Sequence, residues 1–166
     1  MSHIQPVGMK VCSVCLNSDI LCSGCSQKLA AGTISETDVA VSRAITALNK
    51  TRNIAATFLT ASETDDAIII MADKKDTKLL IGGQGRNVKQ LSSLLGKQIR
   101  IIERTDEKDV VENVLRTHVI GINSIFDRGK ETRKIRIDTR LSRKIRHDYV
   151  NVLKKFCGKA YTLSFE

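Results

Sequence analysis

Four of the five cysteines lie near the start of the chain, in the pairs Cys12-x-x-Cys15 and Cys22-x-x-Cys25. Each CxxC turn directs two sulfur atoms toward one point, and four thiolates complete a tetrahedral zinc site. Because a closed four-thiolate site leaves no position for water, the pattern predicts a structural zinc ion. The spacer between the pairs is only six residues long, and metal binding can fold a segment too small to fold by burial alone.

Two other interpretations of these cysteines stay open at the level of sequence. Disulfides use the same residues, but they are rare inside cells. An iron–sulfur cluster takes the same four thiolates. Cys157 stands apart from the pairs on the apolar face of an expected helix, and we expect it in the core, where a free cysteine behaves as a small hydrophobic residue.

The second group of residues suited to chemistry is the run Gly82-Gly83-Gln84-Gly85-Arg86. Three glycines in four positions remove side chains where another molecule must approach the backbone closely. The turn also leaves the first amides of the next helix unpaired, which suits a phosphate. The run therefore predicts a phosphate-binding loop.

Three classes of phosphate-binding loop compete for this run. A nucleotide-hydrolysing P-loop needs Lys-Ser or Lys-Thr after its last glycine, and this chain has Arg86-Asn87 there. A dinucleotide fingerprint needs a third glycine where Val88 stands, and it follows a strand. The GXXG loop of a KH domain lies between two helices and clamps the backbone of a single strand. The third class fits the pattern.

The elements that must position the loop occur twice. A capping box at Ser35-x-x-Asp38 opens a helix, and Gly96 ends the helix after the loop. Apolar spacing predicts strands and helices in the order helix, strand, strand, helix, glycine loop, helix, strand. In the first copy we expect strands at 56–60, 67–71 and 98–103. In the second copy we expect helices at 109–117 and 148–157 and strands at 119–126, 133–138 and 160–165.

The two copies align at a constant offset of 62, which indicates an internal duplication. Leu91 falls on Leu153, and Gly96 falls on Gly158. The glycine loop falls on Lys144-Ile145-Arg146-His147, so the second copy replaces the bare backbone with positive side chains. Its candidate RNA contacts are Arg140, Arg143, Lys144 and Arg146, and an exposed, merely solvated face is the open alternative.

Charge supports a polyanionic partner. The net charge of the 166 residues is +9. Between Arg128 and Lys159 we count twelve Lys/Arg and three Asp/Glu, so this segment alone carries the excess of nine. A basic excess confined to one region predicts a binding patch for a polyanion. Aromatic residues make up only 4% of the chain, which argues against extensive base stacking.

The run Leu80–Lys89, followed by Leu94-Leu95-Gly96-Lys97, resembles a type II KH domain. The tandem arrangement is similar to the KH pair of NusA, especially in small archaeal NusA-like proteins, over residues 35–166. The resemblance implies an α+β fold of two type II KH-like units (helix-strand-strand-helix-helix-strand) preceded by a zinc-binding segment. The expected domains are 1–34 (zinc segment), 35–104 (KH domain with the GXXG loop) and 105–166 (degenerate KH-like domain).

What the resemblance implies about function is single-stranded RNA binding by a NusA-like factor in transcription elongation or termination, with nascent transcript and RNA polymerase as partners. The expected RNA-binding residues of the first unit are Gly82, Gly83, Gln84, Gly85, Arg86 and Lys89. Type II KH folds also occur in ribosomal proteins, so a ribosome-associated or ribosome-assembly module that binds ribosomal RNA is the alternative. A protein-interaction adaptor is a third hypothesis.

An enzyme is the least expected class. The three histidines lie in unrelated contexts, and no nucleophile–base pair or open metal site is visible. We expect no catalytic residue and no small-molecule substrate, and we interpret Asp65, Asp66, Asp73 and Asp76 as turn residues. No apolar run is long enough to span a membrane, and the first residues lack an apolar signal core. We therefore expect a cytoplasmic protein.

Overall fold

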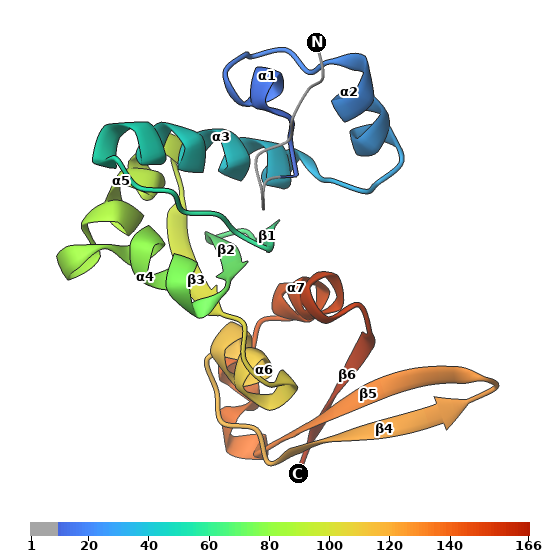
Figure 1. Ribbon diagram of the computed structural model, residues 1–166. Coiled ribbons are helices and arrows are strands. Elements are labelled where there is room, and N and C mark those ends of the chain that lie inside the picture. Colours follow the sequence, from blue (N-terminus) through green and yellow to red (C-terminus); the bar gives the residue numbers. More distant parts are fainter. Residues whose placement is uncertain (1–9) are drawn as a thin grey trace. The chain divides into compact units, whose positions relative to one another are not determined.

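A computed structural model describes residues 10–166, so the first nine residues of the expected 1–34 segment lie outside the described part. The fold is α+β with two three-stranded sheets (Figure 1). The chain divides into two compact units, with the boundary between Ile101 and Ile102. Within residues 10–166 there is no helix of the length and apolar character that crossing a membrane requires.

The first unit begins with two short helices and a long one. Helices α1 (Ser13–Leu16) and α2 (Ser23–Ala30) each start directly after a cysteine, Cys12 and Cys22. Helix α3 (Glu36–Arg52) has the expected capping box, in which Ser35 Oγ accepts from the Asp38 amide and the Asp38 carboxylate accepts from the Ser35 amide. This reciprocal pair satisfies two otherwise unpaired amide donors and sets where α3 begins.

The first sheet has the order β1-β2-β3, with β1 (Thr60–Glu63), β2 (Ala67–Ala72) and β3 (Gln98–Glu103). The prediction for β3 is confirmed to the residue, but the prediction that 56–60 forms the first strand is wrong. Strand β1 starts at Thr60 because the turn lies later than expected: Thr64 Oγ1 accepts from the Ala67 amide and donates to the Ala67 carbonyl. The antiparallel register pairs Thr60 with Met71 and Glu63 with Ile68.

The segment that was expected as a strand is held by side chains instead. The Asn49 amide of α3 bonds both the N–H and the C=O of Ala56. The Asp76 carboxylate accepts from the Thr57 amide and hydroxyl, at 3.2 Å each. Asp76 is therefore a buried residue inside a helix, and its interpretation as a turn residue is wrong.

Two helices flank the glycine loop, as expected. Helix α4 (Lys74–Ile81) ends at Gly82, a short 3₁₀ turn covers Gly83–Gly85, and α5 (Arg86–Leu95) ends at Gly96. Helix α5 packs against α3 and α4. Fully buried apolar side chains from several of these elements share one core, among them Ile45, Leu48, Ile70, Leu80 and Leu91.

The second unit has the sheet order β4-β5-β6. Its elements are α6 (Glu107–Leu115), β4 (Gly121–Asp127), β5 (Lys130–Ile137), a 3₁₀ segment Thr139–Lys144, α7 (Asp148–Cys157) and β6 (Ala160–Phe165). Strands β4 and β5 are antiparallel, and β5 and β6 are parallel. The far end of the β4–β5 hairpin projects away from α6 and α7 (Figure 1).

The offset of 62 is visible in the structure. Residues 86–95 of α5 become 148–157 of α7, and residues 98–103 of β3 become 160–165 of β6. The glycines that end α5 and α7 have matching φ angles, 66° at Gly96 and 67° at Gly158. The second unit departs from the expected order at one point, because the 3₁₀ segment replaces the helix before the loop. Its β5–α7 connection spans ten residues (138–147), against thirteen (73–85) between β2 and α5.

Candidate nucleic-acid interface and metal centre

The four paired cysteines form one cluster. Their Sγ atoms all lie within 4.8 Å of one another, and the Cys12 and Cys22 sulfurs are 3.8 Å apart. Tetrahedral coordination with Zn–S bonds of about 2.3 Å places sulfur atoms about 3.8 Å from one another. The donor set and its spacing therefore fit a four-coordinate metal ion, and Cys12, Cys15, Cys22 and Cys25 would be its ligands.

Backbone amides support the sulfur atoms. The Cys22 amide donates to Cys15 Sγ at 3.0 Å, and the Cys25 amide donates to Cys22 Sγ at 3.4 Å. The Cys25 amide lowers the pKa of Cys22 to about 6, because its hydrogen bond stabilises the thiolate. Burial raises the pKa of Cys15 to about 12. A bound cation would offset the cost of that buried thiolate, which is why this cluster suits a metal ion.

The cysteine cluster is part of the core of the first unit. Cys15, Leu16 and Cys25 are buried in the same cluster as Val41 and Ile45 of α3. Arg43 of α3 donates from Nε to the Cys15 carbonyl at 3.0 Å. A metal ion held by these cysteines would therefore stabilise the part of the core that packs against α3.

The glycine loop has a backbone that requires glycine at specific positions. Gly82 has φ 71° and ψ 174°, and Gly85 has φ 72° and ψ 18°. A Cβ at Gly82 would lie 2.7 Å from the Asn87 side chain, whose Nδ2 donates to the Leu79 carbonyl at 2.7 Å. Asn87 thus joins the end of α4 to the start of α5 across the loop, and only glycine leaves room for it.

The first turn of α5 is open to a ligand. Its N-cap residue is Gly85, which has no side chain to accept from the first amides, whereas Ser35 caps α3 and Asp106 caps α6. A Cβ added to Gly83 would meet no atom within 4 Å, so the middle of the loop faces open space. Gln84 adopts the left-handed conformation at φ 56°. An uncapped helix start beside an open loop suits an anionic group.

A groove of about 460 Å³ lies at the loop. Residues Arg86, Lys89, Gln90 and Ser93 follow helical spacing along one face of α5, and Arg52 from the end of α3 completes the groove with Gly83 and Gln84. Of these seven described lining residues, three are cationic and none is acidic. The groove therefore has the positive charge that attracts a phosphate backbone.

The residues predicted as RNA contacts fall into two groups. Gly83, Gln84, Arg86 and Lys89 line the groove, while Gly82 and Gly85 set the loop backbone. Arg140, Arg143, Lys144 and Arg146 belong to the second unit. There Arg140 is bonded to Asp138 at 2.5 Å, and Arg146 is bonded to Asp148 at 3.2 Å.

Four further residues at the loop and groove are not among those predicted from the sequence pattern: Arg52, Asn87, Gln90 and Ser93. Gln90 and Ser93 could have been found, since they continue the helical face of Arg86 and Lys89. Arg52 could not, because its position beside Gln90 depends on how α3 packs on α5, 38 residues away in the chain.

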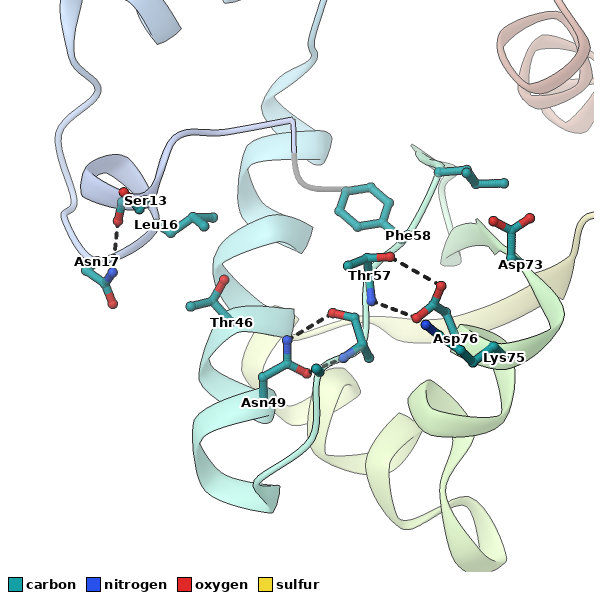
Figure 2. A pocket seen from close by; sticks show the side chains of 13 residues that line it. Ser13, Leu16, Asn17, Thr46, Asn49, Thr57, Phe58, Asp73, Lys75 and Asp76 are labelled. Carbon is teal, nitrogen blue, oxygen red and sulfur yellow. Dashed lines mark hydrogen bonds between the residues drawn. The ribbon is translucent and has the colours of Figure 1, made fainter. Parts of the chain in front are cut away.

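A larger cavity of about 720 Å³ lies elsewhere in the first unit (Figure 2). Leu16 and Asn17 at the end of α1 form one side, and Phe58, Asp73 and Lys75 lie on the other. Much of its polar lining is already engaged: the Asn49 and Asp76 side chains bond Ala56 and Thr57, as the dashed lines in Figure 2 show. None of the residues predicted as RNA contacts lines this cavity.

Comparison with known proteins shows similarity in fold. No family model matches the sequence, and no curated protein matches it. Among solved structures, the small archaeal protein described as "Crystal structure of APE1850" is similar, with a TM-score of 0.55 and 20% sequence identity. The match covers 74% of this chain and 96% of that chain. At this identity the likeness concerns the fold alone.

Proposed function

We propose that this protein binds single-stranded RNA through the glycine loop of its first unit. The observation that carries the proposal is the groove beside Gly83 and Gln84, which has three cations and no acid among its described lining residues. The uncapped start of α5 adds backbone amides to the same place. Phosphates of a strand would lie against the loop and α5, while the apolar side chains Ile81 and Leu94, both partly exposed, offer a surface to bases.

We propose that the two units are type II KH-like domains in tandem. Two units with the strand order β1-β2-β3 and β4-β5-β6, and a GXXG run between two helices, support this assignment. We extend the proposal to a NusA-like role on nascent RNA in transcription elongation or termination. This extension rests on the resemblance of Leu80–Lys89 and the segment that follows it to the KH units of NusA-like proteins.

We also propose that the four-cysteine cluster holds zinc in a structural role. Four thiolate ligands leave no open coordination position, and this favours a structural zinc ion over a catalytic one. Metal analysis of the purified protein would give one zinc per chain. Iron with sulfide, and a brown colour, would replace this assignment with an iron–sulfur cluster.

Negative charge introduced by substitution in the middle of the loop tests RNA binding directly. Gly83 has open space around it, and aspartate tolerates the left-handed conformation of Gln84. The double variant Gly83→Asp/Gln84→Asp should therefore keep the fold while repelling phosphates. We expect its affinity for single-stranded RNA to fall at least about tenfold.

The matched control is Gly83→Asn/Gln84→Asn, which has nearly the same side-chain volumes without the charges. This control should bind RNA within about threefold of the wild-type protein, because exposed neutral changes have small effects. Undiminished binding by the aspartate variant, with its thermal unfolding unchanged, would reject the loop as the RNA site.

A second candidate is a module that binds ribosomal RNA. The exposed Arg143 and Lys144, on the 3₁₀ segment of the second unit, favour it because they carry positive charge in the unit that lacks the glycine loop. Crosslinking of bound RNA in cells distinguishes the two roles. Messages still being transcribed, with RNA polymerase co-purifying, support the NusA-like role, and ribosomal RNA with ribosomal subunits supports the second.

A further inference from the structure

Arg52 brings a positive charge to the groove from outside the loop. It is the last residue of α3, and it lines the groove together with Gly83, Gln84 and the exposed face of α5. Its neighbours Arg86 and Lys89 lie on that face. A strand lying against the loop amides would therefore meet a third cation carried by a different helix.

The guanidinium of Arg52 makes a hydrogen bond through Nε and has further N–H donors at its two Nη groups. Its Nε donates to Gln90 Oε1 at 3.1 Å. Within residues 10–166 the two Nη groups make no hydrogen bond and no ion pair. Two parallel N–H donors on a fixed planar group match the oxygens of a phosphate. Gln90 thus fixes the orientation of the fork through a neutral contact.

The arginines of the second unit offer a contrast. Four of them are bonded to carboxylates: Arg133 to Glu107, Arg136 to Glu166, Arg140 to Asp138 and Arg146 to Asp148. A phosphate would have to compete with those carboxylates. Arg52 has a neutral amide as its partner, so its charge remains available to an anion.

We propose that Arg52 is a second phosphate-binding residue of the groove and that Gln90 is its positioning residue. The loop amides and the start of α5 hold one phosphate of the strand, and the Arg52 fork holds a second. The ligand class is then a single-stranded polynucleotide that presents successive phosphodiesters. This inference rests on the proposed function, since it assigns further contacts in the same groove.

A double-mutant cycle tests the pair in the full-length protein. The variants are Arg52→Ala, Gln90→Ala and the double variant, and the probe is a fluorescently labelled single-stranded RNA of about twelve nucleotides. Lys75→Ala is the matched control, because Lys75 is an exposed cation of the first unit that does not line the groove. Affinity is measured over a range of salt concentrations, and thermal unfolding is measured for each variant.

Loss of one phosphate contact lowers the slope of log affinity against log salt by about 0.7 for a single strand. We expect this decrease for Arg52→Ala, with a loss in affinity of about fivefold. Gln90→Ala should weaken binding less and leave the slope unchanged. The double variant should match Arg52→Ala, because Gln90 acts through Arg52. Lys75→Ala should match the wild-type protein in affinity.

The outcomes separate this inference from the proposed function. If the loop variant Gly83→Asp/Gln84→Asp loses RNA binding but Arg52→Ala behaves like Lys75→Ala, the second phosphate position is rejected and the proposed function stands. If Gln90→Ala adds fully to Arg52→Ala, the positioning role is rejected. If the wild-type protein binds no RNA, both proposals are rejected.

Discussion

At the scale of single residues, Gly82 and Asn87 determine the shape of the loop. Asn87 is buried, and its side chain occupies the space that a Cβ at Gly82 would need. The pair keeps α4 and α5 joined while Gly83 and Gln84 stay exposed. Gly82 therefore sets the backbone of the loop, whereas Gly83 and Gln84 stay open to solvent.

Substituting the two neighbouring glycines should separate these roles. Gly82→Ala combines a left-handed φ with a 2.7 Å contact to Asn87, so we expect it to lower the free energy of unfolding by at least about 1–2 kcal/mol. Gly83→Ala has open space, and we expect a change within about 0.5 kcal/mol. Urea unfolding measures both, and equal stability of the two variants would contradict this account of the loop.

A half-buried acid in the second unit supplies a pH-dependent contact. Glu107 accepts from Arg133 Nε at 3.0 Å and from the Tyr161 hydroxyl at 2.7 Å. The Arg133 hydrogen bond lowers the pKa of Glu107 below the ordinary value of 4.5. Because the folded pKa is the lower one, this contact stabilises the unit fully above about pH 4.5, and the stabilisation is lost as the pH falls toward the folded pKa.

The variant Glu107→Gln tests this dependence. Its melting temperature should be lower than that of the wild-type protein at neutral pH, and the difference should shrink as the pH is lowered below about 4.5. Measurements over that range decide the point. A difference in melting temperature that stays constant with pH would show that the charge of Glu107 does not matter.

At the scale of elements, the cysteine segment and α3 depend on each other. Cys15, Leu16 and Cys25 are buried with residues of α3, while α1 has only four residues and α2 has eight. Isolated helices of this length are not stable in water. The contact with α3, together with a metal ion held by the four cysteines, would supply their stability.

Removal of the metal should release this segment. Binding to four thiolates contributes on the order of 10 kcal/mol, so chelation should expose the amides of α1 and α2 to rapid hydrogen exchange. Amides of β5 in the second unit are the internal control and should stay protected. Unchanged exchange of α1 and α2 after chelation would contradict a structural role for the metal.

The bounds of a helix or strand are predicted well from the sequence where the signal lies within the segment itself. Helix α7 and strand β6 match their predicted bounds, because Gly158 separates an apolar helical pattern from an alternating one. The predicted position of the first strand is wrong because the amides of residues 56 and 57 donate to the side chains of Asn49 and Asp76. No pattern within the segment itself reveals these hydrogen bonds. The metal site was predictable from spacing, whereas the Arg52–Gln90 contact depends on tertiary packing.

At the scale of the whole molecule, the two units share a strand order but differ in whether their cationic side chains are bonded to carboxylates. The sequence places its basic excess in the second unit, yet four arginines there are bonded to carboxylates. The first unit has fewer cations, but Arg52, Arg86 and Lys89 share one groove without an acid among its described lining residues. We therefore propose that a single strand binds to the first unit.

The most direct test of this assignment is amide chemical-shift mapping of the full chain during titration with single-stranded RNA. We expect the largest shifts at Gly83, Gln84, Gly85 and Arg86, with further shifts at Arg52 and Gln90. Shifts confined to Arg140–Arg146, or the absence of any saturable shift in the glycine loop, would contradict it.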